Sequence, residues 1–127
     1  MTTAAPRIIT HIADIDSFTT ADGSTIRELM HPQLHGNQNQ SLAEATIVVG
    51  SITRLHKHDS TEELYHITQG MGEMTLGDKK FVVSSGDTVC IKPGTTHQIR
   101  NIGKVDLKLL CCCSPPYSHA DTVLIDG

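Results

Sequence analysis

The chain has 127 residues, a net charge of −4 and 38% hydrophobic residues, with ten Lys and Arg against fourteen Asp and Glu. This length suits one domain with its own core and is too short for two. Because the basic residues are scattered and aromatic residues make up only 3% of the chain, we expect no nucleic-acid partner. No apolar run approaches the roughly 18 residues of a membrane span, so we expect no membrane partner. Residues 1–11 lack the hydrophobic region of a signal peptide, which predicts a cytoplasmic protein.

Short runs rich in β-forming residues alternate with turn residues along the chain. We expect strands at residues 7–11, 25–29, 43–49, 52–58, 63–69, 72–76, 79–83, 88–91, 97–101 and 106–113, and a last strand or partner-packed segment at 122–125. Residues 12–18 predict a helical turn, His31-Pro32 ends a strand because proline lacks an N–H, and Gly77-Asp78 predicts a hairpin turn. No segment shows a sustained 3.6-residue period. The spacing therefore predicts an all-β barrel or sandwich.

The cysteines are Cys90 and the consecutive Cys111, Cys112 and Cys113. Neighbours in a strand face opposite ways, so the triplet favours neither a CxxC metal clip nor a disulfide framework. Reduced, partly buried thiols are the expectation. If Lys108 faces water, then Leu107, Leu109 and Cys111 face the barrel interior.

Four residues of metal-ligand type occur around the middle of the chain: His56, His58, Glu63 and His97. At positions i and i+2 of a strand, His56 and His58 point to the same side. Glu63 can join them if residues 59–62 form a turn between neighbouring strands, and His97 follows the turn-forming residues 92–96. Three imidazoles and one carboxylate at one point suit one divalent transition-metal ion, whether Mn, Fe, Ni, Co or Zn.

At these residues the sequence resembles the cupin superfamily. The first cupin motif is matched at Gly50, His56, His58, Glu63 and Gly70, and the second by residues 86–97 with Asn101. Lys92 departs from the pattern, because the family usually has proline there and this chain has Pro93 one place later. The motif core covers residues 50–101.

The resemblance implies a small single-domain cupin over residues 1–127, folded as an antiparallel double-stranded β-helix (jelly-roll) barrel. It also implies that His56, His58, Glu63 and His97 bind one metal ion inside the barrel. Some cupins have kept the barrel and lost the metal, but here all four ligand residues are present.

Strand alternation extends from the ligands to candidate catalytic residues. If His56 and His58 face inward, Arg54 does too, and Glu63 brings Tyr65 inward. An inward Arg54 could hold a carboxylate, phosphate or enolate by forked hydrogen bonds, whereas a rim arginine would only pair with an acidic residue. Tyr65 could donate a proton or orient a water, and its alternative is core packing. The spare candidates for acid–base work are His31, His35 and His119, and for each an ordinary loop histidine is the favoured interpretation.

The flanks at residues 25–32 and 114–118 resemble those of small microbial cupins, which include aromatic polyketide cyclases and sugar-isomerase-like proteins. This resemblance implies a metal-dependent enzyme acting on a small oxygenated organic substrate, with enolisation, isomerisation or cyclisation favoured. One alternative is a metal-dependent dioxygenase or decarboxylase, and another is a non-catalytic cupin that binds a small molecule or metal. Exposed Leu55, Leu64 and residues 123–125 predict a homodimer interface.

Overall fold

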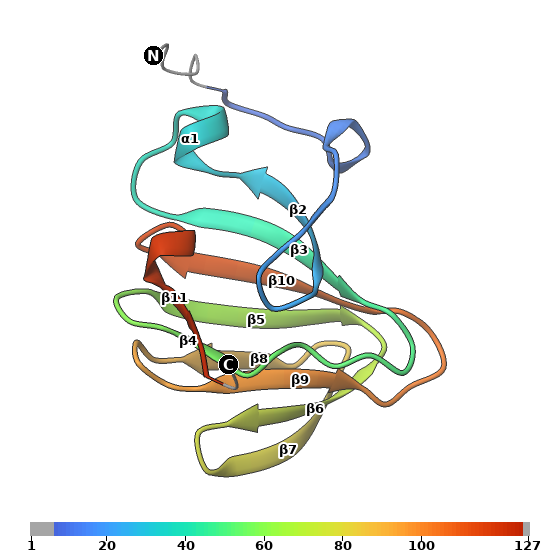
Figure 1. Cartoon of the computed structure of the whole chain (residues 1–127). Helices are drawn as coiled ribbons and strands as arrows, with labels where there is room; N and C mark the ends of the chain where they lie inside the picture. Colours follow the sequence, from blue (N-terminus) through green and yellow to red (C-terminus); the bar gives the residue numbers. More distant parts are fainter. Residues whose placement is uncertain (1–6, 126–127) are drawn as a thin grey trace.

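Alternation of apolar and polar residues along short strands builds two facing antiparallel sheets in the computed structural model, which describes residues 7–125 (Figure 1). The first sheet has six strands, in the order β1 (Phe18–Thr19), β2 (Thr25–Met30), β3 (Ser41–Ile47), β10 (Leu107–Ser114), β5 (Glu62–Gln69) and β8 (Thr88–Ile91). The second has five, in the order β11 (Thr122–Leu124), β4 (His56–His58), β9 (His97–Asn101), β6 (Met71–Leu76) and β7 (Lys79–Ser84). This arrangement confirms the all-β jelly-roll prediction.

The core lies between the two sheets and is built from alternate residues of each strand. On β10, Leu107 and Leu109 are almost fully buried while Lys108 is half-buried. Their partners on β3 are Ile47 and Ala45, which face the same interior. The inward orientation predicted for Leu107, Leu109 and Cys111 is therefore confirmed, as expected for a sheet with one buried face.

Several strand boundaries agree with the sequence prediction, and others differ from it. The strands at residues 88–91 and 97–101 have the predicted bounds, and β11 covers most of the predicted last strand. No strand forms at residues 7–11, and the strand expected at 43–49 begins two residues earlier. The predicted hairpin turn is present, because Gly77 has φ +59° between β6 and β7.

A short helix that the sequence analysis missed follows β2. It is α1 (Pro32–His35), in which Pro32 starts the helix, the His31 side chain accepts a hydrogen bond from the Gln33 N–H, and Gly36 ends it at φ +83°. Pro at the first position and Gly after the last are ordinary helix signals. Proline did end the strand as predicted, but it did so by starting a helix. The described 3₁₀ turns are η1 (Ile12–Asp14), which agrees with the predicted helical turn, and η2 (His119–Asp121).

The stretch before β4 breaks the strand alternation on which the Arg54 prediction relied. The strand expected at residues 52–58 is formed only by His56–His58, and Ile52 makes just an isolated bridge to Arg100. Thr53 and His56 are both buried although they are three residues apart, so the alternation shifts between them. Arg54 is exposed as a consequence.

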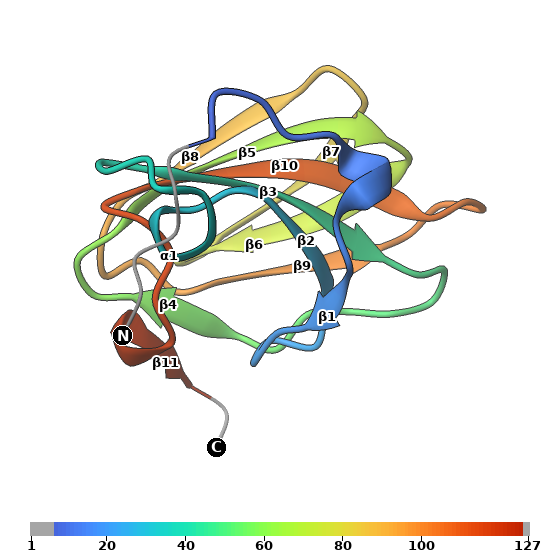
Figure 2. The same ribbon diagram turned by 90° about the horizontal axis from the view of Figure 1, so that it is seen from above.

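The two sheets are seen from above in Figure 2, where β11 lies beside β4. β11 pairs with β4 along its whole length, with Thr122 opposite His58. Within residues 7–125, no helix has both the length and the apolar character needed to cross a membrane.

Asn101 at the end of β9 provides a test of how this end of the barrel is held together. Its Nδ2 donates to the carbonyls of Ile47 and Val105, each at 2.9 Å, and its Oδ1 accepts from the Gly103 N–H at 2.9 Å. At about 1 kcal/mol net for each hydrogen bond, Asn101→Ala should lower the free energy of unfolding by about 3 kcal/mol. Urea denaturation measures this change.

The matched control is Gln98→Ala on the same strand. Gln98 makes one side-chain hydrogen bond, from Nε2 to the Thr53 carbonyl at 3.2 Å, and it is only half-buried. We expect a loss of about 1 kcal/mol or less. Equal losses in the two variants would contradict the bracing role of Asn101.

Candidate metal centre

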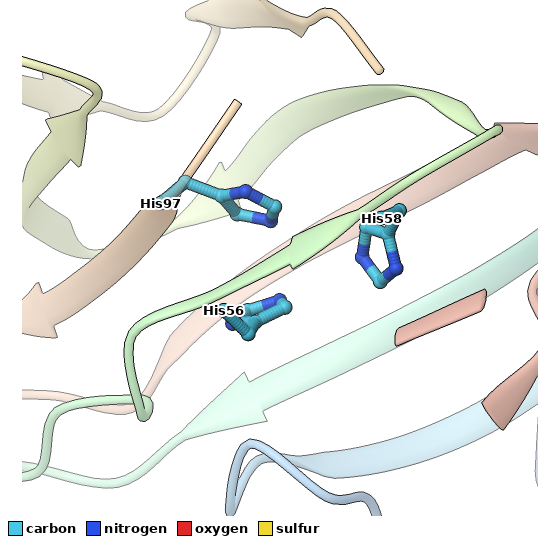
Figure 3. A group of neighbouring side chains, drawn as sticks. All are labelled: His56, His58 and His97. Carbon is cyan, nitrogen blue, oxygen red and sulfur yellow. The ribbon is translucent and has the colours of Figure 1, made fainter. Parts of the chain in front are cut away.

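Three histidines from two strands meet inside the barrel. His56 and His58 lie on β4, and His97 on the adjacent β9 is directly opposite His56. Figure 3 shows the three imidazoles pointing toward one another, and one nitrogen from each lies within 4.8 Å of the others. All three side chains are buried, so they meet away from bulk water.

Glu63 approaches this cluster from the opposite sheet. Its Oε1 lies 3.3 Å from His58 Nε2 and 3.4 Å from His97 Nε2. The prediction that residues 59–62 turn between neighbouring strands is wrong, because β4 and β5 belong to different sheets. The chain instead crosses the barrel, and Asp121 holds this crossing by accepting hydrogen bonds from the N–H groups of Ser60 and Thr61.

Hydrogen bonds at the outer nitrogens define how each imidazole is oriented. His56 Nδ1 lies 2.8 Å from the Arg54 carbonyl, and His97 Nδ1 lies 3.0 Å from the Thr95 carbonyl. A carbonyl only accepts, so both Nδ1 atoms bear the proton. Thr122 Oγ1 donates to the Ser118 carbonyl and is therefore free to accept from His58 Nδ1 at 3.1 Å. In neutral imidazoles this tautomer leaves each Nε2 with a lone pair.

When all three imidazoles are neutral, the inward atoms are therefore all electron-pair donors. Within the described residues, His97 Nε2 and Glu63 Oε1 are buried and have no hydrogen-bond partner. Buried acceptors that face each other without a donor are costly, and a shared cation removes that cost. Three imidazole nitrogens and a carboxylate oxygen in this arrangement fit a divalent transition-metal ion.

Burial and mutual attraction set the protonation of the cluster. Burial alone would raise the pKa of Glu63, but His58 and His97 outweigh it and bring that pKa to about 2. Burial and then the charge of His97 lower the pKa of His56. For His58, burial lowers the pKa but Glu63 more than offsets it, so the net shift is upward. Glu63 is thus a carboxylate at neutral pH.

Cys113 holds the Glu63 carboxylate through the oxygen that does not face the histidines. Its Sγ donates to Glu63 Oε2 at 3.4 Å, and the thiol is buried. Burial, followed by the negative charge of Glu63, raises the pKa of Cys113 and keeps it a protonated donor. All four cysteines are free thiols, as the sequence analysis expected, but it assigned no role to Cys113.

A cavity opens beside the cluster and contains about 600 Å³ of space not occupied by atoms, its open mouth included. Its lining includes His56, His58, Glu63 and Tyr65. Tyr65 is inward as predicted, and burial together with the charge of Glu63 raises the pKa of its hydroxyl well above the ordinary value. These residues place hydrogen-bonding groups next to the centre.

Arg54 does not line this cavity. Its side chain is exposed, and the prediction that it faces inward with the ligand histidines is wrong for the reason given above. The spare histidines have structural contacts instead. His31 and His35 are buried around α1, where His31 caps the helix and His35 Nδ1 accepts from the His31 N–H. His119 is exposed and contacts the Tyr117 hydroxyl at 3.3 Å.

Two acidic residues that the sequence analysis missed also line the cavity, Asp22 and Glu28. Asp22 Oδ1 accepts from the Thr20 and Ser24 hydroxyls, while its Oδ2 lies 3.6 Å from His56 Nε2. Asp22 sits next to Gly23 and looks like a simple turn residue in sequence. Glu28 could have been found, because Ile26 and Glu28 alternate onto one face of the predicted strand.

Several known proteins resemble this chain in sequence or in fold. An uncharacterized protein of Methanocaldococcus jannaschii, MJ1618, is 53% identical over 94% of this chain and 95% of its own length. Among solved structures, the oxalate decarboxylase of Lactobacillus farciminis in a formate complex has a TM-score of 0.79 at 21% identity, covering 91% of this chain. This chain spans only 35% of that protein. Streptomyces PAC13 with uridine has a TM-score of 0.78 at 10% identity, covering 94% of this chain and 91% of PAC13.

These structural likenesses concern the fold, since both identities are low. The sequence pattern described as the cupin domain matches residues 43–113, which is more than half of the 127 residues. The matched region contains the three clustered histidines and Glu63. The chain therefore belongs to the cupin family.

Proposed function

We propose that this protein is a metal-dependent enzyme that acts on a small oxygenated organic substrate. One divalent transition-metal ion would be held by Nε2 of His56, His58 and His97 and by Glu63 Oε1. The observation that carries this proposal is the set of buried lone pairs, since His97 Nε2 and Glu63 Oε1 have no hydrogen-bond partner among the described residues. Mixed imidazole and carboxylate donors suit Mn, Fe, Ni, Co or Zn.

The cavity beside the centre supports an enzyme that binds a small molecule. The structural neighbours also support an enzyme, because they include an oxalate decarboxylase and a protein described as a nucleoside dehydratase. Their sequence identity to this chain is 21% and 11%, so they support the class of protein and leave the reaction to be argued from the site.

The arrangement of side chains favours proton transfer next to a carbonyl, as in enolisation, isomerisation or cyclisation. A bound metal would act as a Lewis acid that polarises a substrate oxygen. Asp22 offers Oδ2 on the cavity side of His56, while its Oδ1 is fixed by Thr20 and Ser24. A carboxylate held in this way can accept a proton from the adjacent carbon of the substrate. Tyr65, buried and protonated, can donate a hydrogen bond into the same space.

Metal content tests the proposed ligands. Protein purified without a His-tag should contain about one transition-metal ion per chain, measured by elemental analysis. His58→Ala removes one donor and Glu63→Gln removes the charge, and each should weaken metal binding by at least about a hundredfold, more than the 10–100-fold effect typical of residues around the ligands.

His66→Ala is the matched control for this experiment. His66 also lies next to the centre in sequence, on β5, but it is exposed and bonds to Thr88 Oγ1 at 2.8 Å. Its removal should leave metal content unchanged. Loss of the ion in His66→Ala, or its retention in His58→Ala, would show that the ion binds elsewhere.

Hydrogen exchange tests the reaction class. In D₂O, the metal-loaded protein should exchange the proton next to the carbonyl of a substrate hydroxyketone, detected by NMR, without consuming oxygen. Asp22→Asn keeps the shape of the side chain and should slow this exchange by about 10²–10⁴-fold, the usual contribution of a positioned base. Oxygen uptake with the Fe(II)-loaded protein and no exchange would favour oxygenation instead.

A homodimer stays a prediction of the sequence, and the structure limits how it can form. Leu64 on β5 and Val123 on β11 are partly exposed, but they belong to different sheets and do not define one continuous surface. Light scattering at micromolar concentration should give about twice the mass of the chain. A monomeric mass would contradict this prediction. A single domain over residues 1–127 and a cytoplasmic location also stay predictions.

A further inference from the structure

The cavity beside the proposed metal centre has an acidic lining. Three carboxylates, Asp22, Glu28 and Glu63, contribute to its lining, and none of the described residues that line it is Lys or Arg. Glu63 is already in contact with His58 and His97. Asp22 and Glu28 therefore decide what kind of molecule can occupy the remaining space.

Glu28 is the most unusual group in this lining. Its side chain is only 6% exposed, and Oε2 is buried with no hydrogen-bond partner among the described residues. Burial raises the pKa of Glu28, although His31 partly opposes this shift. An unpaired buried carboxyl group reduces stability. A purely structural role would be served better by an apolar residue at this position of β2.

The position of Glu28 places it across the cavity floor from the centre. It pairs in register with Ala43, Ala43 pairs with Cys111, and Cys111 pairs with Tyr65 beside the centre. Ala43 and Cys111 are small, so the floor between Glu28 and Tyr65 is left open. A molecule that reaches the centre with one end can reach Glu28 with the other.

Most hydroxyl groups around the cavity already have partners within the protein. Thr20 and Ser24 donate to Asp22, and Thr122 donates to the Ser118 carbonyl. The charged oxygens that the cavity offers an incoming molecule are thus acceptors, while Tyr65 offers a neutral donor. A carboxylate accepting from a hydroxyl forms a strong, charge-assisted hydrogen bond, whereas a second anion would be repelled.

We propose that the substrate is an uncharged, polyhydroxylated molecule with a carbonyl or hydroxyl oxygen at the metal end and a hydroxyl group that donates to Glu28 at the other end. This inference rests on the metal-dependent function proposed above and adds its substrate class. Glu28 acts as a specificity-determining residue: it accepts the hydroxyl hydrogen bond and disfavours carboxylic acids of the same size.

Matched pairs of ligands test this substrate class by calorimetry on the Zn²⁺-loaded protein. Each pair has one neutral hydroxyketone and the corresponding acid: dihydroxyacetone and glycerate, erythrulose and threonate, xylulose and xylonate. Carboxylates are the better ligands for free Zn²⁺, so a preference for the neutral member has to come from the cavity. We expect the neutral member of the best-bound pair to bind at least tenfold more tightly than its acid.

Two substitutions assign the preference to Glu28. Glu28→Leu should weaken binding of the best neutral ligand at least tenfold, and Glu28→Gln, which removes the charge, should lower the neutral-to-acid preference at least fivefold. The control is Glu62→Gln, because Glu62 is exposed on β5 and should change neither value. Thermal unfolding of each variant shows that it is folded.

Tighter binding of the acids, an unchanged preference in Glu28→Gln, or no binding of any of the three neutral ligands would overturn the inference. The zinc content of the same samples distinguishes failure of the proposed metal-dependent function from failure of the proposed substrate class. Protein that takes up no zinc contradicts the proposed metal-dependent function, whereas zinc-loaded protein that prefers the acids contradicts only the substrate class.

Discussion

The structure depends on one constraint: three imidazoles and one carboxylate, all buried, face each other beside the cavity. The imidazoles cannot turn away, because each Nδ1 is engaged by a carbonyl or hydroxyl group of the surrounding chain. Glu63 cannot withdraw either, since it lies on a central pair of strands and accepts from Cys113 on its far side. Such a fixed set of acceptors is stable only if protons or a cation lie between them.

The same barrel makes the environment of the centre unsymmetrical. Glu63 reaches the histidines from one sheet, and Asp22 lies 3.6 Å from His56 Nε2, between β1 and β2. Glu28 lies further along the inner face of β2, and its Oε2 has no hydrogen-bond partner among the described residues. The acidic groups thus surround a cavity whose floor is small and apolar. If a hydroxylated molecule binds there, its hydrogen bonds offset these costs.

The fold class and the residues that cluster could be predicted from the sequence. Much of what surrounds the cluster could not. His56 and His58 share one face through side-chain alternation, which local residues control, whereas Glu63 and His97 were identified from their match to the cupin motifs. Arg54 was misplaced because the strand starts only at His56, and the preceding residues follow a loop path fixed by the Thr53 contact to Ile99. Asp22 could not be found, because its approach to His56 depends on packing between residues 34 positions apart.

Glu28 is an intermediate case, since alternation places it inward but only the assembled barrel leaves its Oε2 without a hydrogen-bond partner among the residues that the structure describes. The strand carrying Glu63 was likewise found correctly, while its assignment to the opposite sheet depended on the long-range pairing with β10. Pairings of this kind are decided by the whole core and not by local spacing.

The most direct test of the central claim is anomalous X-ray diffraction from crystals of the zinc-loaded protein, recorded on both sides of the zinc absorption edge. Our account predicts one anomalous peak about 2.0–2.2 Å from Nε2 of His56, His58 and His97 and from a Glu63 oxygen, the usual zinc–ligand distances. No peak among these four side chains, or a peak bound through Nδ1 atoms at the surface, would contradict it.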